Sequence, residues 1–184
     1  TTLDPFQETG GLADLNGNLG SAVMKVSAVE ISRRKITAPV RVFNDQESVL
    51  KAFRDGEFIN DVIIAVRYQG PRANGMPELH NLTPCMSVLQ TRGLNVALIT
   101  DGRMSGASGK VPAAIHMSPE ALDEGPIAYL QDGDIVTVNA LNGTIDVDNN
   151  KIFDRKVNHP DLMNNSFGVG RELFDIFRNN AGPA

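Results

Sequence analysis

The chain has 184 residues, of which 41% are apolar, and this is enough for the core of one domain. Its formal net charge of −5 argues against nucleic acid and membrane surfaces as partners, because an acidic surface attracts neither. The single cysteine, Cys85, excludes an internal disulfide framework and an iron–sulfur cluster held only by this chain, and it fits a reducing cytoplasm.

The first twenty residues are rich in Gly, Asn, Asp and Thr and have no sustained period. They predict an inter-domain arm or linker over 1–20, followed by one domain over 21–184. No apolar run approaches the ~20 residues that span a bilayer, and the start has no secretory pattern. Because the chain opens on polar residues without a methionine, we expect a fragment of a longer protein.

Six segments have the pattern of β-strands. Residues 61–67 and 96–100 are nearly continuous apolar runs, typical of strands covered on both faces. Asn142-Gly143 separates two alternating segments and strongly indicates a hairpin. In chain order, the predicted strands are 22–29, 39–43, 61–67, 96–100, 134–140 and 144–148.

Three segments have helical spacing, namely 45–55, 83–92 and 170–179. Asn44 or Asp45 can cap the first of these helices. In the last, Leu173, Phe174 and Phe177 share one face, and residues 118–121 resemble a further helix start. Both buried runs and a hairpin are present, so the fold class is α/β, with a mixed, barrel-like sheet and flanking helices.

The loop after the strand 96–100 combines glycines, hydroxyls and cations. Its glycine-rich backbone can present N–H groups to an anion, and Arg103 and Lys110 add positive charge, while Ser105 and Ser108 add hydroxyls. A plainer explanation is also open, in which the glycines only form turns and the serines cap a following helix. The loop therefore indicates an anion site without establishing one.

Two familiar motifs do not fit this loop. Lys110 is followed by Val111, unlike the phosphate loop of nucleotide hydrolases, and Arg103 stands where a hydrolase elbow has glycine.

Among the histidines, His116 has the pattern of a hydrogen-bonded core residue, His80 is the better candidate for the site, and His159 has a surface pattern.

The loop 70–79, GPRANGMPEL, is dense in Gly and Pro. Glu78 follows a buried strand in a rigid setting, where a carboxylate can bind Mg²⁺. A solvated glutamate is the alternative. One carboxylate does not make a metal site, so further ligands would have to come from elsewhere.

Taken together, five segments resemble the carboxy-terminal domain of the dihydroxy-acid and 6-phosphogluconate dehydratases. The resemblance covers nearly the whole chain in order, and SGASGK and GVGRELF are similar to the 6-phosphogluconate branch. The segments are 10–20, 70–79, 100–121, 125–140 and 168–173.

The resemblance implies an Entner–Doudoroff enzyme that converts 6-phospho-D-gluconate to 2-dehydro-3-deoxy-6-phosphogluconate and water. It implies a swivelling β/β/α domain and an iron–sulfur cluster bound by an amino-terminal domain that this chain lacks. We therefore expect a cytoplasmic homodimer, with the isolated carboxy-terminal domain inactive. Alternatives are another dihydroxy-acid or sugar-acid dehydratase, a non-catalytic anion-binding module, and an isomerase subunit related to the mobile domain of aconitase.

The resemblance also assigns roles to residues. Ser105 matches a serine that takes the C2 proton as an alkoxide, and Glu78 matches a Mg²⁺ ligand. A departure is Ala107, where some sugar-acid dehydratases carry threonine. Substrate-binding roles are expected at Arg103, Gly106, Ser108 and Lys110, although Lys110 is equally explained as a solvated surface residue.

Overall fold

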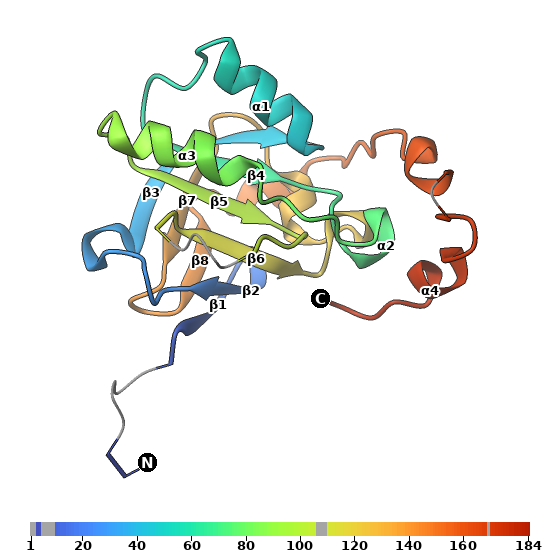
Figure 1. Cartoon of the computed structure of the whole chain (residues 1–184), viewed down its shortest axis with the longest axis horizontal. Coiled ribbons are helices and arrows are strands. Elements are labelled where there is room, and N and C mark those ends of the chain that lie inside the picture. Colours follow the sequence, from blue (N-terminus) through green and yellow to red (C-terminus); the bar gives the residue numbers. More distant parts are fainter. Residues whose placement is uncertain (1–2, 5–9, 106–109, 169) are drawn as a thin grey trace.

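A closed barrel of eight strands forms the centre of the described part of the molecule (Figure 1). The computed structural model describes residues 3–4, 10–105, 110–168 and 170–184. Around the barrel the order is β1-β2-β6-β5-β4-β3-β7-β8. The strands are β1 (Leu12–Gly17), β2 (Gly20–Lys25), β3 (Lys35–Phe43), β4 (Val62–Val66), β5 (Val96–Thr100), β6 (Ala113–Ser118), β7 (Ile135–Asn139) and β8 (Thr144–Val147).

Four neighbouring strands of this barrel, β3, β4, β5 and β6, run parallel. The helix α1 (Gln46–Arg54) connects β3 to β4, and α2 (Pro71–Asn74) and α3 (Leu82–Thr91) lie between β4 and β5. A short helix, α4 (Asp175–Asn179), lies near the carboxyl end of the chain. Because the four strands are parallel, their carboxyl ends meet at one end of the barrel, and the loops that follow them meet there too.

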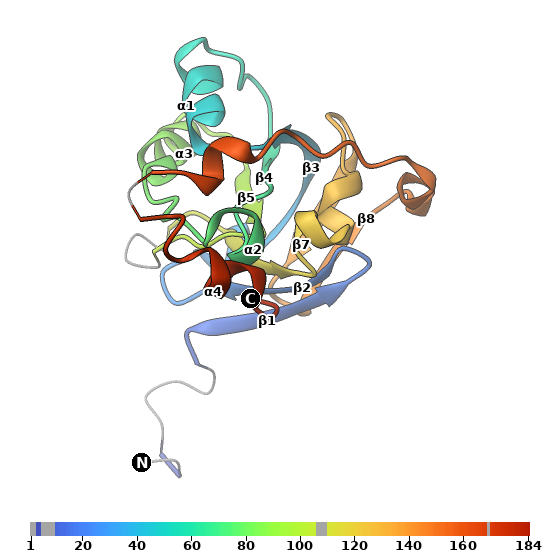
Figure 2. The same cartoon turned by 90° about the vertical axis from the view of Figure 1, so that its right-hand side faces the viewer.

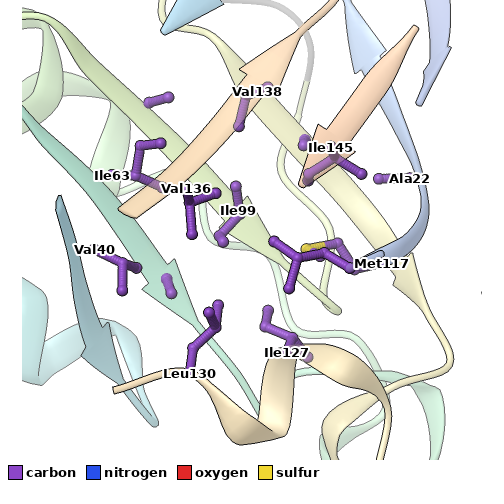
Figure 3. Close-up of a cluster of buried hydrophobic side chains, with 14 of the residues drawn as sticks. Ala22, Val40, Ile63, Ile99, Met117, Ile127, Leu130, Val136, Val138 and Ile145 are labelled. Carbon is purple, nitrogen blue, oxygen red and sulfur yellow. The ribbon is translucent and has the colours of Figure 1, made fainter. Parts of the chain in front are cut away.

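Strand β4 is buried on both faces, as its apolar run predicts. Ile63 and Ala65 belong to the core inside the barrel, while Val62, Ile64 and Val66 belong to a second core that includes residues of α1 and α3. Figure 3 shows Ile63 in one cluster with buried side chains from β3, β5, β7 and β8. The parallel half of the sheet is thus held between two apolar layers.

The stretch 12–20 differs from the prediction of an arm or linker. Leu12–Gly17 forms β1, which pairs along its whole length with β2. The side chain of Asn18 then extends the contact with β8, because its Nδ2 donates to Val147 O at 2.8 Å and its Oδ1 accepts from Val147 N at 2.7 Å. A stretch poor in apolar residues can form a strand here because strand pairing and one amide side chain satisfy its backbone.

Three helix expectations differ from the structure. The chain after the glycine-rich loop forms β6 rather than a helix, and residues 121–123 form only a 3₁₀ turn. At the carboxyl end, the helix α4 covers only the second half of 170–179. Gly170 has φ +82°, a left-handed conformation that excludes it from the helix, and residues 171–174 form turns before α4 begins. Among the described residues, no helix has the length and apolar character needed to cross a bilayer.

The other predicted strands and helices are present, but two bounds differ by several residues: the strand predicted over 22–29 is β2, which ends at Lys25, and the strand predicted over 39–43 is β3, which begins at Lys35. Val96–Thr100 has the predicted bounds, and the hairpin of β7 and β8 turns at Asn142-Gly143. Asp45 caps α1, accepting from Ser48 N at 2.7 Å. The predicted α/β class with a mixed, barrel-like sheet is confirmed.

Candidate functional site

Three loops meet where the parallel strands end, and one buried carboxylate joins them. Asp101, directly after β5, accepts hydrogen bonds from Tyr68 N at 3.0 Å and Gln69 N at 2.9 Å in the loop after β4. It also accepts from Ala121 N at 3.0 Å, after β6. These bonds fix the three strand ends relative to one another, and the candidate residues follow directly in the chain.

Asp101 is fully buried, and the sequence pattern does not mark it as a site residue. Burial raises the pKa of the Asp101 carboxyl, while the N–H groups of Ala121, Gln69 and Tyr68 act in the opposite direction. The sequence feature that could have indicated this buried carboxylate is an aspartate immediately after a buried strand, in the dipeptide Asp101-Gly102. A carboxylate there has to be matched by donors, and here they are backbone amides of neighbouring loops.

A second buried carboxylate, Glu120, holds the loop that carries Glu78. Its oxygens accept from Arg72 N at 2.9 Å and Ala73 N at 3.3 Å in the short helix α2. A Cβ at Gly70 would lie 1.8 Å from Glu120 Oε2, so only glycine allows this close approach. Burial raises the pKa of Glu120, and the two N–H donors lower it. Glu120 therefore positions the 70–79 loop.

The structure brings three predicted site residues together. Glu78 Oε1 accepts from Ser105 N at 2.7 Å, and Glu78 Oε2 accepts from Arg103 Nη1 at 3.1 Å. Arg103 Nε also donates to Met76 O at 2.8 Å. An isolated β-bridge between Glu78 and Arg103, with Leu79 N donating to Arg103 O at 3.2 Å, joins the two loop backbones.

This arrangement places a serine at the surface on a fixed backbone. Ser105 is exposed, whereas Glu78 is half-buried beneath it. Both carboxylate oxygens of Glu78 take part in bonds within the chain, one to the guanidinium and one to the serine amide. The positive charge of Arg103 offsets the negative charge of the Glu78 carboxylate. An anion near Ser105 is therefore not repelled by an unpaired negative charge.

Lys110 lies elsewhere. It lines a cavity of about 420 Å³ beside α3, together with Arg33 and Glu30 from the segment after β2. Its backbone oxygen accepts from Gln90 Nε2 at 3.5 Å. Gly106 and Ser108 lie outside the described residues, so the structure says nothing of their predicted roles.

The histidines and the cysteine occupy different settings. His80 is exposed two residues after Glu78, and His159 is exposed, with its ring against buried Tyr68. His116 is only half-buried, and its backbone N–H donates to Gly102 O at 2.9 Å. Cys85 is buried in α3, and burial raises the pKa of its thiol.

The described residues by themselves fit neither of the expected inorganic groups. They contain no group of three or more His, Cys, Asp or Glu side chains placed to hold a metal ion. Glu78 is bonded to Arg103 and Ser105, and the buried thiol of Cys85 lacks the companions that a cluster requires. Further ligands for a metal or a cluster would have to come from another part of the protein.

Comparison with known proteins gives consistent matches. The family model described as "Dihydroxy-acid/6-phosphogluconate dehydratase C-terminal" matches residues 1–184. The chain is 54% identical over 182 residues to phosphogluconate dehydratase of Rhizobium meliloti, covering 98% of this chain and 30% of that protein. Against the Escherichia coli K12 protein of the same name, identity is 51% over 176 residues, or 95% and 29% of the two chains.

A relative with a different name matches less of the chain. Dihydroxy-acid dehydratase of Sulfurisphaera tokodaii is 43% identical over 148 residues, which cover 79% of this chain and 26% of that protein. The chain thus spans under a third of the length of each of these curated relatives.

Proposed function

Because this chain belongs to the carboxy-terminal family of the dihydroxy-acid and 6-phosphogluconate dehydratases, we propose that it forms one wall of a phosphogluconate dehydratase active site. The carrying observation is the match along nearly the whole chain to relatives named phosphogluconate dehydratase, at 51% to 54% identity. The proposed reaction removes water from 6-phospho-D-gluconate and leaves a 2-keto-3-deoxy acid.

In this proposal Ser105 is the base. Its alkoxide takes the proton from C2, the C2–H electron pair forms the C2–C3 double bond, and hydroxide departs from C3. The resulting enol then becomes the 2-keto acid by moving a proton from the C2 oxygen to C3. A serine hydroxyl is a very weak acid, so its ionised form needs nearby donors and positive charge.

The ion pair beneath Ser105 fits this role because it fixes the serine backbone and leaves no unpaired negative charge beside it. Glu78 holds the Ser105 backbone at 2.7 Å, and Arg103 supplies the compensating positive charge at 3.1 Å from the same carboxylate. A guanidinium has five N–H donors, more than the bonds to Met76 and Glu78 use, so Arg103 can also meet a substrate carboxylate. Lys110 lies apart beside α3 and is proposed only for a more distant anionic group of the substrate.

The iron–sulfur cluster is assigned to an amino-terminal part of the full-length protein, where it would act as the Lewis acid for the leaving hydroxide. The same part would supply the other ligands of any Mg²⁺ at Glu78, and Glu78 would have to exchange Arg103 for the metal. A cytoplasmic location and a homodimer complete the proposal. These assignments rest on the resemblance and on the chain's 30% share of its relative's length.

The test compares Ser105→Ala with the parent in the full-length protein, handled without oxygen, by the rate of 2-keto-acid formation from 6-phospho-D-gluconate. Removal of a general base lowers kcat by roughly 10²- to 10⁴-fold, and a drop in this range is expected. Ser32→Ala, at an exposed serine in the 3₁₀ turn after β2, is the matched control and should keep parental activity.

Two outcomes would contradict the proposal. If Ser105→Ala kept parental activity, the proposal that Ser105 is the general base would be refuted. A higher kcat/KM for an unphosphorylated 2,3-dihydroxy acid than for 6-phospho-D-gluconate would instead assign the protein to the dihydroxy-acid branch.

A further inference from the structure

The carboxy-terminal segment carries large apolar side chains that face solvent. Figure 1 shows this segment as an arc that leaves the barrel and returns beside α2. Phe174 and Phe177 are 55% and 68% exposed, although their spacing is typical of a buried helix face. We define the carboxy-terminal apolar surface as Met163, Phe167, Leu173, Phe174, Ile176 and Phe177.

Arg171 bonds the carboxy-terminal segment to Asn74 of α2, and Arg171 and Arg178 both brace the segment internally at Asn165. Arg171 Nη1 donates to Asn74 Oδ1 at 3.0 Å and to Asn165 O at 2.8 Å, and Arg178 Nη1 donates to the same Asn165 oxygen at 2.7 Å. Figures 1 and 2 both place α4 next to α2, and residues of the two helices line a cavity of about 350 Å³. The apolar side chains are therefore presented from an anchored segment.

Asn74, which holds the carboxy-terminal segment, is linked by hydrogen bonds to the candidate site. Asn74 Nδ2 donates to Gln69 Oε1 at 3.0 Å, and Gln69 N donates to Asp101 at 2.9 Å. The same helix α2 continues into the loop that carries Glu78. A partner that covers the carboxy-terminal apolar surface would thus contact the element next to Glu78 and Ser105.

We propose that the carboxy-terminal apolar surface docks the amino-terminal part of the same full-length protein. This rests on the proposed function, in which the site needs groups that the chain lacks. The matching family is described as carboxy-terminal, and about 30% of the relative's length is matched, so the larger share lies outside this chain. Aromatic side chains flanked by arginines are the composition of a tightly bound interface centre, and exposed apolar patches mark such surfaces.

The experiment places a photoreactive p-benzoyl-L-phenylalanine at position 177 of the full-length protein, where the 68% exposed Phe177 leaves room for the larger aromatic group. After irradiation, the cross-linked peptides are mapped by mass spectrometry. A link within one chain, from position 177 to a residue upstream of this 184-residue segment, is the expected result. The matched control carries the same group at Ile59, which is 75% exposed away from the carboxy-terminal segment, and should give no such link.

A link between two chains at position 177 would show that a second copy covers the surface, and the proposal would fail. Equal absence of links at 177 and 59 would overturn it as well. A second measurement uses Phe174→Asp with Phe177→Asp, which should speed limited proteolysis upstream of residue 10 at least about tenfold, while Ile59→Asp should leave the rate unchanged. Cross-linking detects docking without measuring turnover. A negative cross-linking result therefore contradicts the docking proposal, whereas an active Ser105→Ala variant contradicts the proposed base.

Discussion

Asp101 controls the site although it lies beneath the exposed residues. It is fully buried and bonded to backbone amides of two other loops, and those loops lead to Glu78 and to Glu120. Glu78 in turn fixes the amide of Ser105. Sequence reading found Glu78, Arg103 and Ser105 because their types suit acid–base and anion chemistry. It missed Asp101 because the donors that match its carboxylate come from loops 20 and more residues away.

Replacing Asp101 by Asn should destabilise the chain by about 2 kcal/mol, because an amide nitrogen would then face at least one buried N–H and leave that donor unpaired. Urea unfolding of the parent and variant measures the difference. Asp123→Asn, at a partly exposed carboxylate paired with Arg72, is the control and should change stability by less than about 1 kcal/mol. Equal losses in the two variants would contradict the role given to Asp101.

At the scale of elements, ion pairs fasten the irregular segments to the barrel. Asp134, just before β7, bonds Arg155 through both carboxylate oxygens, at 2.5 Å and 2.8 Å. Arg155 Nη1 also donates to Tyr129 O at 3.1 Å. The 3₁₀ turn Asn150–Asp154 is thereby held against the segment that precedes β7. The bonds from Arg155 lower the pKa of Asp134, and partial burial opposes them.

This lowered pKa gives a pH dependence with a definite sign. The stabilisation is complete above the unfolded pKa of about 3.9 and is lost as the pH falls through the lower folded value. Asp134→Asn should cost about 1 kcal/mol at pH 7, and the difference from the parent should shrink below about pH 4. Unfolding of the parent, Asp134→Asn, Arg155→Met and the double variant, at pH 7 and pH 3, measures the coupling. A coupling that does not diminish at pH 3 would refute this interpretation.

At the scale of the whole molecule, closure of the barrel depends on a short seam. β1 and β8 share one paired position, Asn16 with Thr144, before β1 ends. The side chain of Asn18 then pairs with both the N–H and the C=O of Val147. A Cβ at Gly17 would lie 2.0 Å from Ile145 O, so the seam also requires glycine there.

Asn18→Ala should therefore cost about 2 kcal/mol, because the buried Val147 would lose the partners of both backbone groups. Hydrogen exchange should locate the loss at the Val147 amide. Asn142→Ala, at an exposed position in the turn of the same hairpin, is the control and should leave that amide unchanged. If exchange at Val147 were unaffected in Asn18→Ala, the seam would have to close by other contacts.

Local pattern was enough to predict the α/β class, the apolar strands β4 and β5, the cap of α1 and the hairpin, and the resemblance of five segments in order indicated the family. Each depends on side-chain period, turn chemistry or segment order, which a linear sequence carries directly. The ends of the chain show its limits, since 12–20 joins the barrel and the apolar side chains near Phe177 face solvent.

Tertiary structure decided which chemistry-bearing residues meet. Glu78 and Ser105 are 27 residues apart and come together because they follow adjacent parallel strands, whereas Lys110, only five residues after Ser105, lies beside α3. Donor partners, barrel closure and burial depend on contacts between distant segments. Nothing in the local sequence specifies those contacts, because they form only when the strands pair and the two cores pack.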